Sequence, residues 1–201
     1  MKVILVNGSP NLKGNTYLAL KECADTLNEE NIDTEIVSIG SKPVRGCMGC
    51  ERCRELKRCI FDDDMANKLA EKMKEANGII IGSPVYYAGP NGALCALLDR
   101  IFYSSSKELR YKPSAAVCVC RRSGGSATLD RLNKYFTINQ MPIVSSIYWN
   151  ILHGSEIGEV KEDLEGLQTM RMLARNMAFY LKNMPGVDIK KEKRILTNFV
   201  R

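Results

Sequence analysis

The hydrophobic positions of this chain alternate between short apolar runs and longer amphipathic segments. Four apolar runs and one alternating stretch have the character of strands, and they lie at residues 3–6, 32–39, 78–82, 115–120 and 141–144. Apolar residues at helical spacing predict five helices, at residues 15–27, 62–76, 93–103, 127–136 and 163–182. Two longer segments, 40–61 and 145–162, connect these elements, and the first has no period. A long irregular segment in a compact domain is usually functional.

The order of these elements predicts the fold class. Strands separated by helices need crossover connections, which give a parallel sheet covered by helices on both faces. Five strands favour an α/β fold with a flavodoxin-like, doubly wound parallel sheet in the order 2-1-3-4-5 and three layers, rather than a six-stranded Rossmann sheet. No repeat or low-complexity linker interrupts the pattern, so we expect one domain over residues 1–184. The basic C-terminal tail at 185–201 has an apolar end and is expected to pack on another surface, such as a second subunit.

The composition excludes several classes of protein. With 45% hydrophobic residues the chain can fill a core, which excludes global disorder. No apolar run approaches the ~20 residues of a membrane helix, and the first run is too short for a signal peptide. We therefore expect a cytoplasmic protein without a membrane partner. A net charge of +6 is basic, but it is below the density of a dedicated nucleic-acid binder, so no nucleic-acid partner is expected.

The chain contains eight cysteines, and four of them lie within the segment 40–61: Cys47, Cys50, Cys53 and Cys59. Three cysteines at two-residue intervals match the run that wraps three corners of a [4Fe–4S] cluster, and a fourth nearby closes it. Structural zinc usually takes two separated cysteine pairs. An ordered loop with free thiols has the same spacing, whereas a disulfide is not expected in a reducing cytosol. Cluster, free thiols and zinc therefore all remain open, in that order of preference.

Basic side chains surround these four cysteines. This part of the loop contains two acidic residues, Glu51 and Glu55, and five basic ones: Arg45, Arg52, Arg54, Lys57 and Arg58. Any one of them is typical of a solvated loop. Together they would balance an anionic cluster and steer an acidic electron carrier such as a ferredoxin.

The remaining cysteines and the single histidine favour ordinary structural roles. Cys23, Cys95, Cys118 and Cys120 lie in predicted helices and strands and are expected in the core. With His153 as its one histidine, the chain lacks the residues for a Ser-His-Asp or zinc-hydrolase mechanism. Tyr148 and Trp149 either cover a ligand or anchor their loop.

The loop after the first strand, residues 8–16, lies at the edge where open parallel sheets bind ligands. It has neither the G-x-G-x-x-G of a dinucleotide site nor the Gly-Lys-Ser/Thr of a Walker loop. Hydroxyls of Ser9 and Thr16, the amide of Asn15 and the N–H groups of the next helix suit one phosphate monoester. An ordinary strand-to-helix turn capped by Asn15 or Thr16 is the alternative.

Two further loops are expected at the same edge. The loop at 83–92 offers Pro84, Tyr86 and Tyr87, with glycines that let backbone amides approach a flat ligand. Aromatic rings and backbone donors suit the isoalloxazine ring of a flavin. The loop at 121–126 has glycines for close approach and an arginine that would stabilise negative charge near N1 of a reduced flavin.

In combination these motifs resemble the NADPH-dependent FMN reductase branch of flavodoxin-fold proteins. The resemblance covers about residues 1–183 and rests on residues 8–16, 83–86, 97–100 and 121–125. Within that branch, the cysteine run followed by Asp62-Asp63-Asp64-Met65 resembles the iron–sulfur flavoproteins. The resemblance implies a flavodoxin fold, bound FMN and a homo-oligomer, dimer or tetramer, whose subunits share the flavin site.

Carried over by position, the resemblance also implies the residues of the site. The first loop would hold the phosphate, the second would line the ribityl chain and the ring, and residues 123–125 would lie beside the ring. The candidate FMN residues are Ser9, Pro10, Asn11, Gly14, Asn15, Thr16, Pro84, Val85, Tyr86, Tyr87, Gly89, Arg121, Ser123, Gly124 and Gly125. The candidate cluster ligands are Cys47, Cys50, Cys53 and Cys59.

The predicted function is that of an FMN-dependent oxidoreductase of iron–sulfur flavoprotein type. It would pass electrons from ferredoxin or NAD(P)H through FMN to a small-molecule acceptor. No catalytic acid–base residue is required, because the flavin carries the chemistry and the protein positions it. Two alternatives remain: a cluster-free NAD(P)H:FMN or quinone reductase, and a non-enzymatic, redox-sensing electron carrier.

Overall fold

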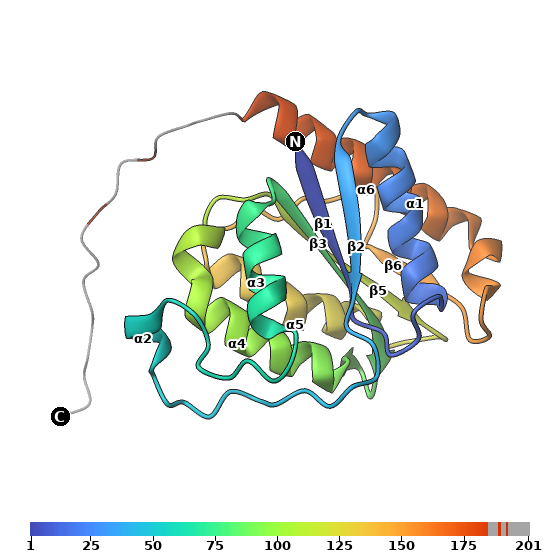
Figure 1. Cartoon of the computed structure of the whole chain (residues 1–201). Coiled ribbons are helices and arrows are strands. Elements are labelled where there is room, and N and C mark those ends of the chain that lie inside the picture. The colour runs from blue at the N-terminus through green and yellow to red at the C-terminus, as the bar shows by residue number, and fades with distance from the viewer. Residues whose placement is uncertain (185–188, 190–191, 193–201) are drawn as a thin grey trace, which may run out of the picture.

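The computed structural model describes residues 1–184, 189 and 192, and strands and helices alternate along them (Figure 1). The strands are β1 (Lys2–Asn7), β2 (Asp33–Ser38), β3 (Gly78–Tyr86), β4 (Gly89–Pro90), β5 (Ser114–Cys120) and β6 (Ile151–His153). The helices are α1 (Asn15–Glu29), α2 (Cys53–Leu56), α3 (Ala66–Glu75), α4 (Gly92–Leu109), α5 (Gly125–Ile138) and α6 (Leu164–Asn183), with a 3₁₀ turn, η1 (Glu159–Glu162). The predicted tail lies outside the described residues, apart from residues 189 and 192.

Five of the strands form a parallel sheet in the order β2-β1-β3-β5-β6, which confirms the predicted flavodoxin-like order. The two-residue strand β4 lies off this path and pairs antiparallel with the end of β3. In the central register, Val6 pairs with Ile81, and Ile81 pairs with Ala116. The carboxyl ends of β1, β3 and β5 therefore meet at one edge, where their loops lie close together.

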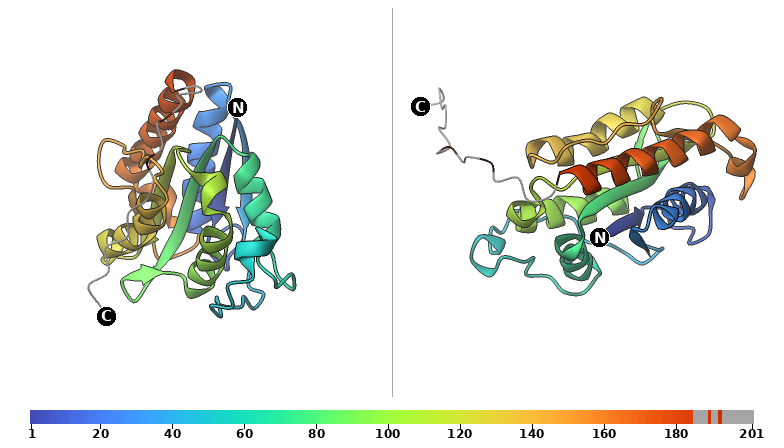
Figure 2. Two further views of the ribbon diagram at one scale, coloured as in Figure 1. Left: turned by 90° about the vertical axis from the view of Figure 1, so that its left-hand side faces the viewer. Right: turned by 90° about the horizontal axis from the view of Figure 1, so that it is seen from above.

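Helices cover both faces of the sheet, so the domain has three layers (Figure 2). One core contains Leu20 of α1 and Met170 of α6, and the other contains Leu97 of α4 and Phe136 of α5. Successive residues of the run 79–81 in β3 contribute to alternate cores. Because both faces of the central strands are buried, those strands are continuous apolar runs rather than alternating ones. Burial of one such isoleucine contributes about 1.5–3 kcal/mol.

The prediction of the fifth strand at 141–144 is half right. That segment forms a single isolated bridge, between Ile143 and Ser114, whereas the strand proper is β6. Both segments pair with β5: Val144 N–H donates to the Ser114 carbonyl at 2.8 Å, and Cys118 N–H donates to the Asn150 carbonyl at 2.9 Å. The edge strand is thus interrupted between these two points, and its three-residue second part is too short to give a hydrophobic period.

The predicted helix at 62–76 begins later than expected, at Ala66. Residues 62–65 belong to the loop before the helix. There Asp64 accepts a hydrogen bond from Ala66 N–H at 2.9 Å, and Asp62 accepts one from the Asn67 side chain at 3.0 Å. The segment 40–61 also contains a short helix, α2, that its sequence does not predict. Among the described residues, no helix combines the length and the apolar character needed to cross a membrane.

Candidate functional site

The three predicted loops enclose one cleft of about 230 Å³ at the carboxyl edge of the sheet. Its lining includes nine candidate FMN residues: Ser9, Asn11, Gly14, Asn15, Thr16, Pro84, Val85, Tyr86 and Arg121. Within the described chain, Pro10, Tyr87 and Gly89 do not line this cleft, and residues 123–125 line a neighbouring pocket. The structure therefore brings together most, but not all, of the residues that the sequence predicts.

The first loop is held against β3 by its own backbone. Gly8 N–H donates to the Gly82 carbonyl at 2.8 Å, and a Cβ atom on Gly8 would lie 2.7 Å from that carbonyl oxygen. Further along, Asn7 Oδ1 accepts from Ser9 N–H at 3.1 Å, and Ser9 Oγ accepts from Asn11 N–H at 3.1 Å. The loop can adopt this path only because glycine occupies position 8.

The loop leads into the N-terminus of α1, whose N-cap is Gly14 and not Asn15 or Thr16 as the alternative interpretation supposes. No side chain of the described residues accepts a hydrogen bond at this cap. The first N–H groups of α1 are therefore available, and the helix dipole places partial positive charge at the end of the cleft. This arrangement suits a phosphate group bound by neutral donors.

The amide of Asn15 makes two hydrogen bonds that its sequence does not indicate. Its Nδ2 donates to the Glu156 carbonyl at 2.8 Å, and its Oδ1 accepts from Gly158 N–H at 2.7 Å. Asn15 thus ties the segment 154–158 to the first turn of α1, which places Ser155 in the cleft lining. The sequence pattern does not indicate this segment, because β6 is too short to be predicted and the loop after it is therefore not expected at the ligand edge.

The loop after β3 is a tight hairpin. Val85 pairs with Pro90 and Tyr86 with Gly89, so Tyr87 and Ala88 alone form the turn. Both turn residues have positive φ, 49° and 57°. Residues other than glycine, asparagine or aspartate rarely adopt this conformation, which two-residue hairpins require. The strained turn lies directly beside the cleft and leaves the Tyr87 side chain fully exposed.

The loop at 121–126 packs against that hairpin. Gly124 has a φ of +86°, and a Cβ atom there would lie 2.8 Å from the Ala88 Cα atom. Only glycine permits this approach. On its other side the loop lines the neighbouring pocket of about 320 Å³, together with Tyr148 and Trp149, whose ring centroids are 5.3 Å apart. Both rings are largely exposed, so in the described part of the chain they do not anchor their loop in the core.

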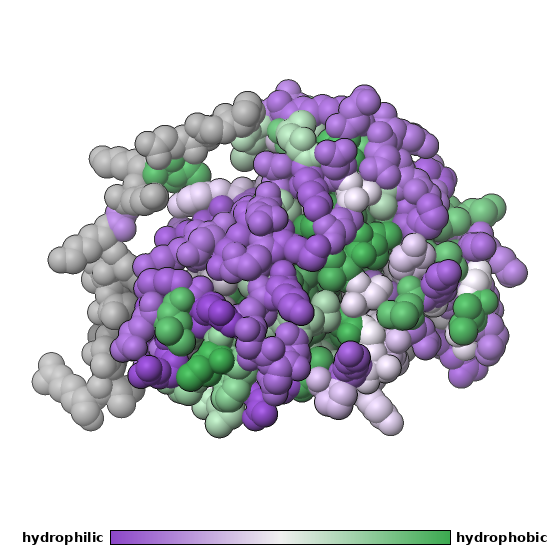
Figure 3. Space-filling model, viewed as in Figure 1, coloured by the Kyte–Doolittle hydropathy of each residue, from purple (hydrophilic) through white to green (hydrophobic). Residues whose placement is uncertain are grey.

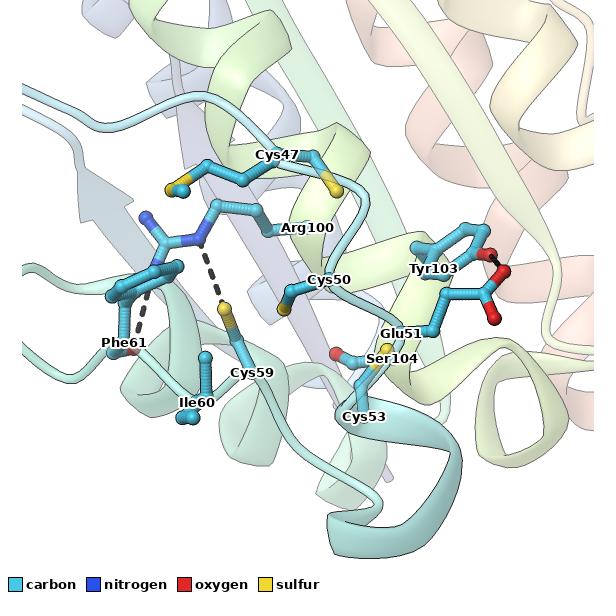
Figure 4. Close-up of a pocket in the computed structure, with 11 residues that line it drawn as sticks. Cys47, Cys50, Glu51, Cys53, Cys59, Ile60, Phe61, Arg100, Tyr103 and Ser104 are labelled. Carbon is cyan, nitrogen blue, oxygen red and sulfur yellow. Dashed lines mark hydrogen bonds between the residues drawn. The ribbon is translucent and has the colours of Figure 1, made fainter.

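The four cysteines of the segment 40–61 line one small pocket (Figure 4). All four are free thiols: Cys47 and Cys50 are exposed, and Cys53 and Cys59 are partly buried. Burial raises the pKa of the Cys53 thiol, and the three other thiols of the group raise it further. Among the described residues, no three histidine, cysteine or acidic side chains are placed to hold a single metal ion together.

Arg100 and Asn67 attach this loop to the domain. The Arg100 side chain, on α4, is 1% exposed and contacts both Cys59 and Asp64. Asn67, on α3, holds the backbone of Cys59 through a bond in each direction, both 3.0 Å long. In the sequence Arg100 stands out only as part of the motif at 97–100, and nothing there indicates a role for Asn67. A buried arginine can be found from sequence only when its carboxylate partner is known.

The arginines of the loop are paired with carboxylates of the loop or of the residues directly after it. Four arginine–carboxylate pairs have N···O distances of 2.7–3.7 Å: Arg45–Asp63, Arg52–Glu55, Arg54–Glu51 and Arg58–Asp62. Exposed pairs of this kind contribute little to stability. On the face seen in Figure 3, hydrophobic side chains interrupt the hydrophilic surface near α2. Within the loop, Met48, Leu56 and Ile60 are exposed. The surface is therefore less uniformly basic than the sequence suggests.

The other four cysteines largely have the predicted core character. Cys23, Cys118 and Cys120 are buried, and Cys95 is partly buried. Burial raises the pKa of all four thiols, which keeps them protonated and unreactive at neutral pH.

Comparison with known proteins agrees with this geometry. The family model for NADPH-dependent FMN reductase matches residues 1–156. An iron–sulfur flavoprotein of Methanocaldococcus jannaschii is 37% identical over 190 residues, which cover 90% of this chain and 98% of that protein. An NADPH azoreductase of Bacillus sp. is 29% identical over 196 residues, 94% of this chain and 100% of that protein. A solved archaeal flavodoxin matches with a TM-score of 0.62 at 16% identity, over 91% of this chain and 100% of that one. The chain therefore belongs to the NADPH-dependent FMN reductase family and is a flavin-dependent oxidoreductase with a flavodoxin-like fold.

Proposed function

We propose that this protein is an electron-transfer oxidoreductase that binds FMN in the cleft and a [4Fe–4S] cluster in the cysteine pocket. The observation that carries the proposal is that four free thiols line one pocket beside α4. The same helix begins directly after the hairpin of the cleft, with Asn91 as its N-cap. Residues of one helix, α4, thus lie beside both sites.

The donors that line the cleft, and its place at the carboxyl edge of the sheet, suit FMN. The phosphate end of the cleft has the uncapped N-terminus of α1 and the hydroxyls of Ser9 and Thr16, and its outer part has Tyr86 beside the hairpin. The backbone lies so close to Gly82 at Gly8, and to Ala88 at Gly124, that a side chain would have no room at either position. When bound, FMN would supply hydride or single-electron transfer at its ring. The chain itself binds the phosphate, orients the ring and restricts access to it.

The cysteine pocket fits a cluster better than a single ion. A tetrahedral zinc site brings four sulfurs to about 2.3 Å from one point, and no such group is present among the described residues. In a [4Fe–4S] cluster each cysteine binds a different iron, so the sulfurs surround a larger space. Four free thiols that line one pocket without converging on a point support a cluster over a single ion.

The donor, the acceptor and the assembly follow from this proposal. With a cluster, one-electron exchange with a ferredoxin is the expected route into the protein, and NAD(P)H is the alternative donor. A small molecule is the acceptor. Further parts of the proposal are a homo-oligomer, in which the exposed Tyr87 side chain would contact a second copy, and a cytoplasmic location.

A cluster-free NAD(P)H:FMN or quinone reductase is the second candidate. Exposure of the Cys47 and Cys50 thiols to solvent favours it. In that protein the four cysteines would remain free thiols, and the cleft would still bind FMN.

Two variants separate these candidates. Cys53→Ser removes a thiol of the pocket, and Cys95→Ser, on α4 but outside the pocket lining, is its matched control. After anaerobic reconstitution we expect Cys53→Ser to keep FMN, to lose iron and to lose reduction by ferredoxin, whereas Cys95→Ser keeps all three. If wild type and Cys53→Ser bind FMN equally and neither binds iron, the cluster-free reductase is correct. A chain that cannot be reconstituted with FMN would remove both candidates.

A further inference from the structure

Arg100 is a cation buried between α4 and the cysteine loop. Its side chain is 1% exposed, and all three of its nitrogens donate to that loop (Figure 4). Nε donates to Cys59 Sγ at 3.2 Å, and Nη2 donates to the Phe61 carbonyl at 3.1 Å. Nη1 contacts the Arg45 carbonyl at 3.2 Å and also the Asp64 carboxylate. Arg100 is thus a point at which the domain contacts a sulfur atom of the pocket directly.

The bond to sulfur is separable from attachment of the loop. Asn67 already fixes the backbone of Cys59 on both sides and also donates to the Phe61 carbonyl at 3.1 Å. None of these bonds involves the Cys59 sulfur. Asn67 therefore fixes the backbone of Cys59, whereas Arg100 contacts its sulfur.

A donor at this position affects a cluster electrostatically. Reduction adds negative charge to the cluster and its sulfur ligands, and an N–H···S bond stabilises that charge. Partners of this kind beyond the ligands themselves also orient the ligand and tune the metal. Because the Arg100 and Asp64 side chains are 1% and 8% exposed, water screens this interaction little.

We propose that Arg100 is a positioning residue of the cysteine pocket: its Nε–H bond orients the Cys59 sulfur and raises the reduction potential of the bound cluster. This inference rests on the proposed function, because it requires the cluster. Asp64 balances the charge of Arg100, which lowers the cost of burying the cation. The hydrogen bond from Arg100 Nε to the Cys59 sulfur is made in the presence of this pair.

The test is a redox titration of the reconstituted protein, with iron content measured in parallel. Arg100→Met/Asp64→Asn removes the charge pair without changing the net charge, and asparagine can still accept the bond from Ala66 N–H. The matched control, Asn67→Ala, loosens the same loop but leaves the bond to sulfur intact. We expect the double variant to shift the reduction equilibrium about tenfold toward the oxidised cluster, which is about 59 mV for one electron. The control should keep the wild-type potential, even if both variants lower the Tm.

If the double variant does not bind iron, the reduction potential of a single variant is measured instead. Asp64→Asn alone leaves Arg100 in place and removes its counter-charge, so the potential should rise. A potential that is unchanged in both Arg100 and Asp64 variants, or that moves equally in Asn67→Ala, would show that Arg100 only attaches the loop. Absence of iron from the reconstituted wild type would instead contradict the proposed function, so the two failures are distinguishable.

Discussion

Substitution of Gly8 by alanine tests whether the first loop must lie against β3 to form the cleft. The added Cβ atom would lie 2.4 Å from Leu94 Cδ2 and 2.7 Å from the Gly82 carbonyl oxygen. The leucine side chain can rotate away, but the carbonyl belongs to the central strand, so the loop itself must move. That movement also weakens the 2.8 Å bond from Gly8 N–H to Gly82.

The cost of this change follows from its geometry. Overpacking of a tight interior costs about 1–3 kcal/mol, and a domain of this size loses about 2–4 °C in Tm per kcal/mol. We therefore expect Gly8→Ala to lower the Tm of the apoprotein by about 2–12 °C. We also expect a Kd for FMN that is at least about tenfold higher, or about 1.4 kcal/mol, because the displaced loop carries Ser9 and leads into α1.

Calorimetry of the apoprotein gives the Tm, and titration of FMN fluorescence gives the Kd. Gly92→Ala is the control, since a Cβ atom at Gly92 meets nothing within 4 Å and alanine is favoured in a helix. The control should match or exceed wild-type stability and bind FMN normally. If Gly8→Ala matched the control in both quantities, the close approach of the loop to β3 would not shape the cleft.

Three further predictions concern other parts of the domain. Asn15→Ala should remove two hydrogen bonds and lower the free energy of unfolding by about 1–3 kcal/mol. Limited proteolysis should then cleave the segment 154–158 faster than in wild type. An unchanged cleavage rate would contradict the role of Asn15. Ala88→Gly should relieve the positive φ and stabilise the protein by about 0.5–1 kcal/mol in chemical denaturation, whereas a loss would refute strain there. Bonds from Lys2 and Lys72 hold the Glu35 pKa below its ordinary 4.5. The ionised Glu35 therefore contributes to the free energy of unfolding above pH 4.5, and this contribution is lost as the pH falls further. Wild type should be more stable than Glu35→Gln at pH 7, and the two should become equally stable in acid. A difference in unfolding free energy that does not change with pH would contradict this role of Glu35.

The fold was largely predictable because its signals are local. The central run at 79–81 is apolar at every position, which is typical of a strand buried on both faces. The interrupted edge strand was not predictable, because pairing with β5 is decided by tertiary contacts of Ile143 and Ile151 and not by a period in the sequence. The start of α3 at Ala66 likewise depends on what Asp64 binds.

The site was predictable at the level of loops rather than of individual side chains. Topology alone places the loops after β1, β3 and β5 at one edge, and they do enclose one cleft. The side-chain roles depend on partners that are distant in sequence: Asn15 turns toward Gly158, and Arg100 toward Cys59. The outward direction of Tyr87 follows from a strained turn that its sequence does not indicate.

The central claim is that one chain holds both a flavin and an iron–sulfur cluster. It is tested most directly by the amounts of iron, acid-labile sulfide and FMN per chain in protein purified and reconstituted without oxygen. We expect one FMN with about four iron and about four sulfide per chain. One FMN per chain with iron and sulfide at background would contradict the cluster and leave a cluster-free flavin reductase.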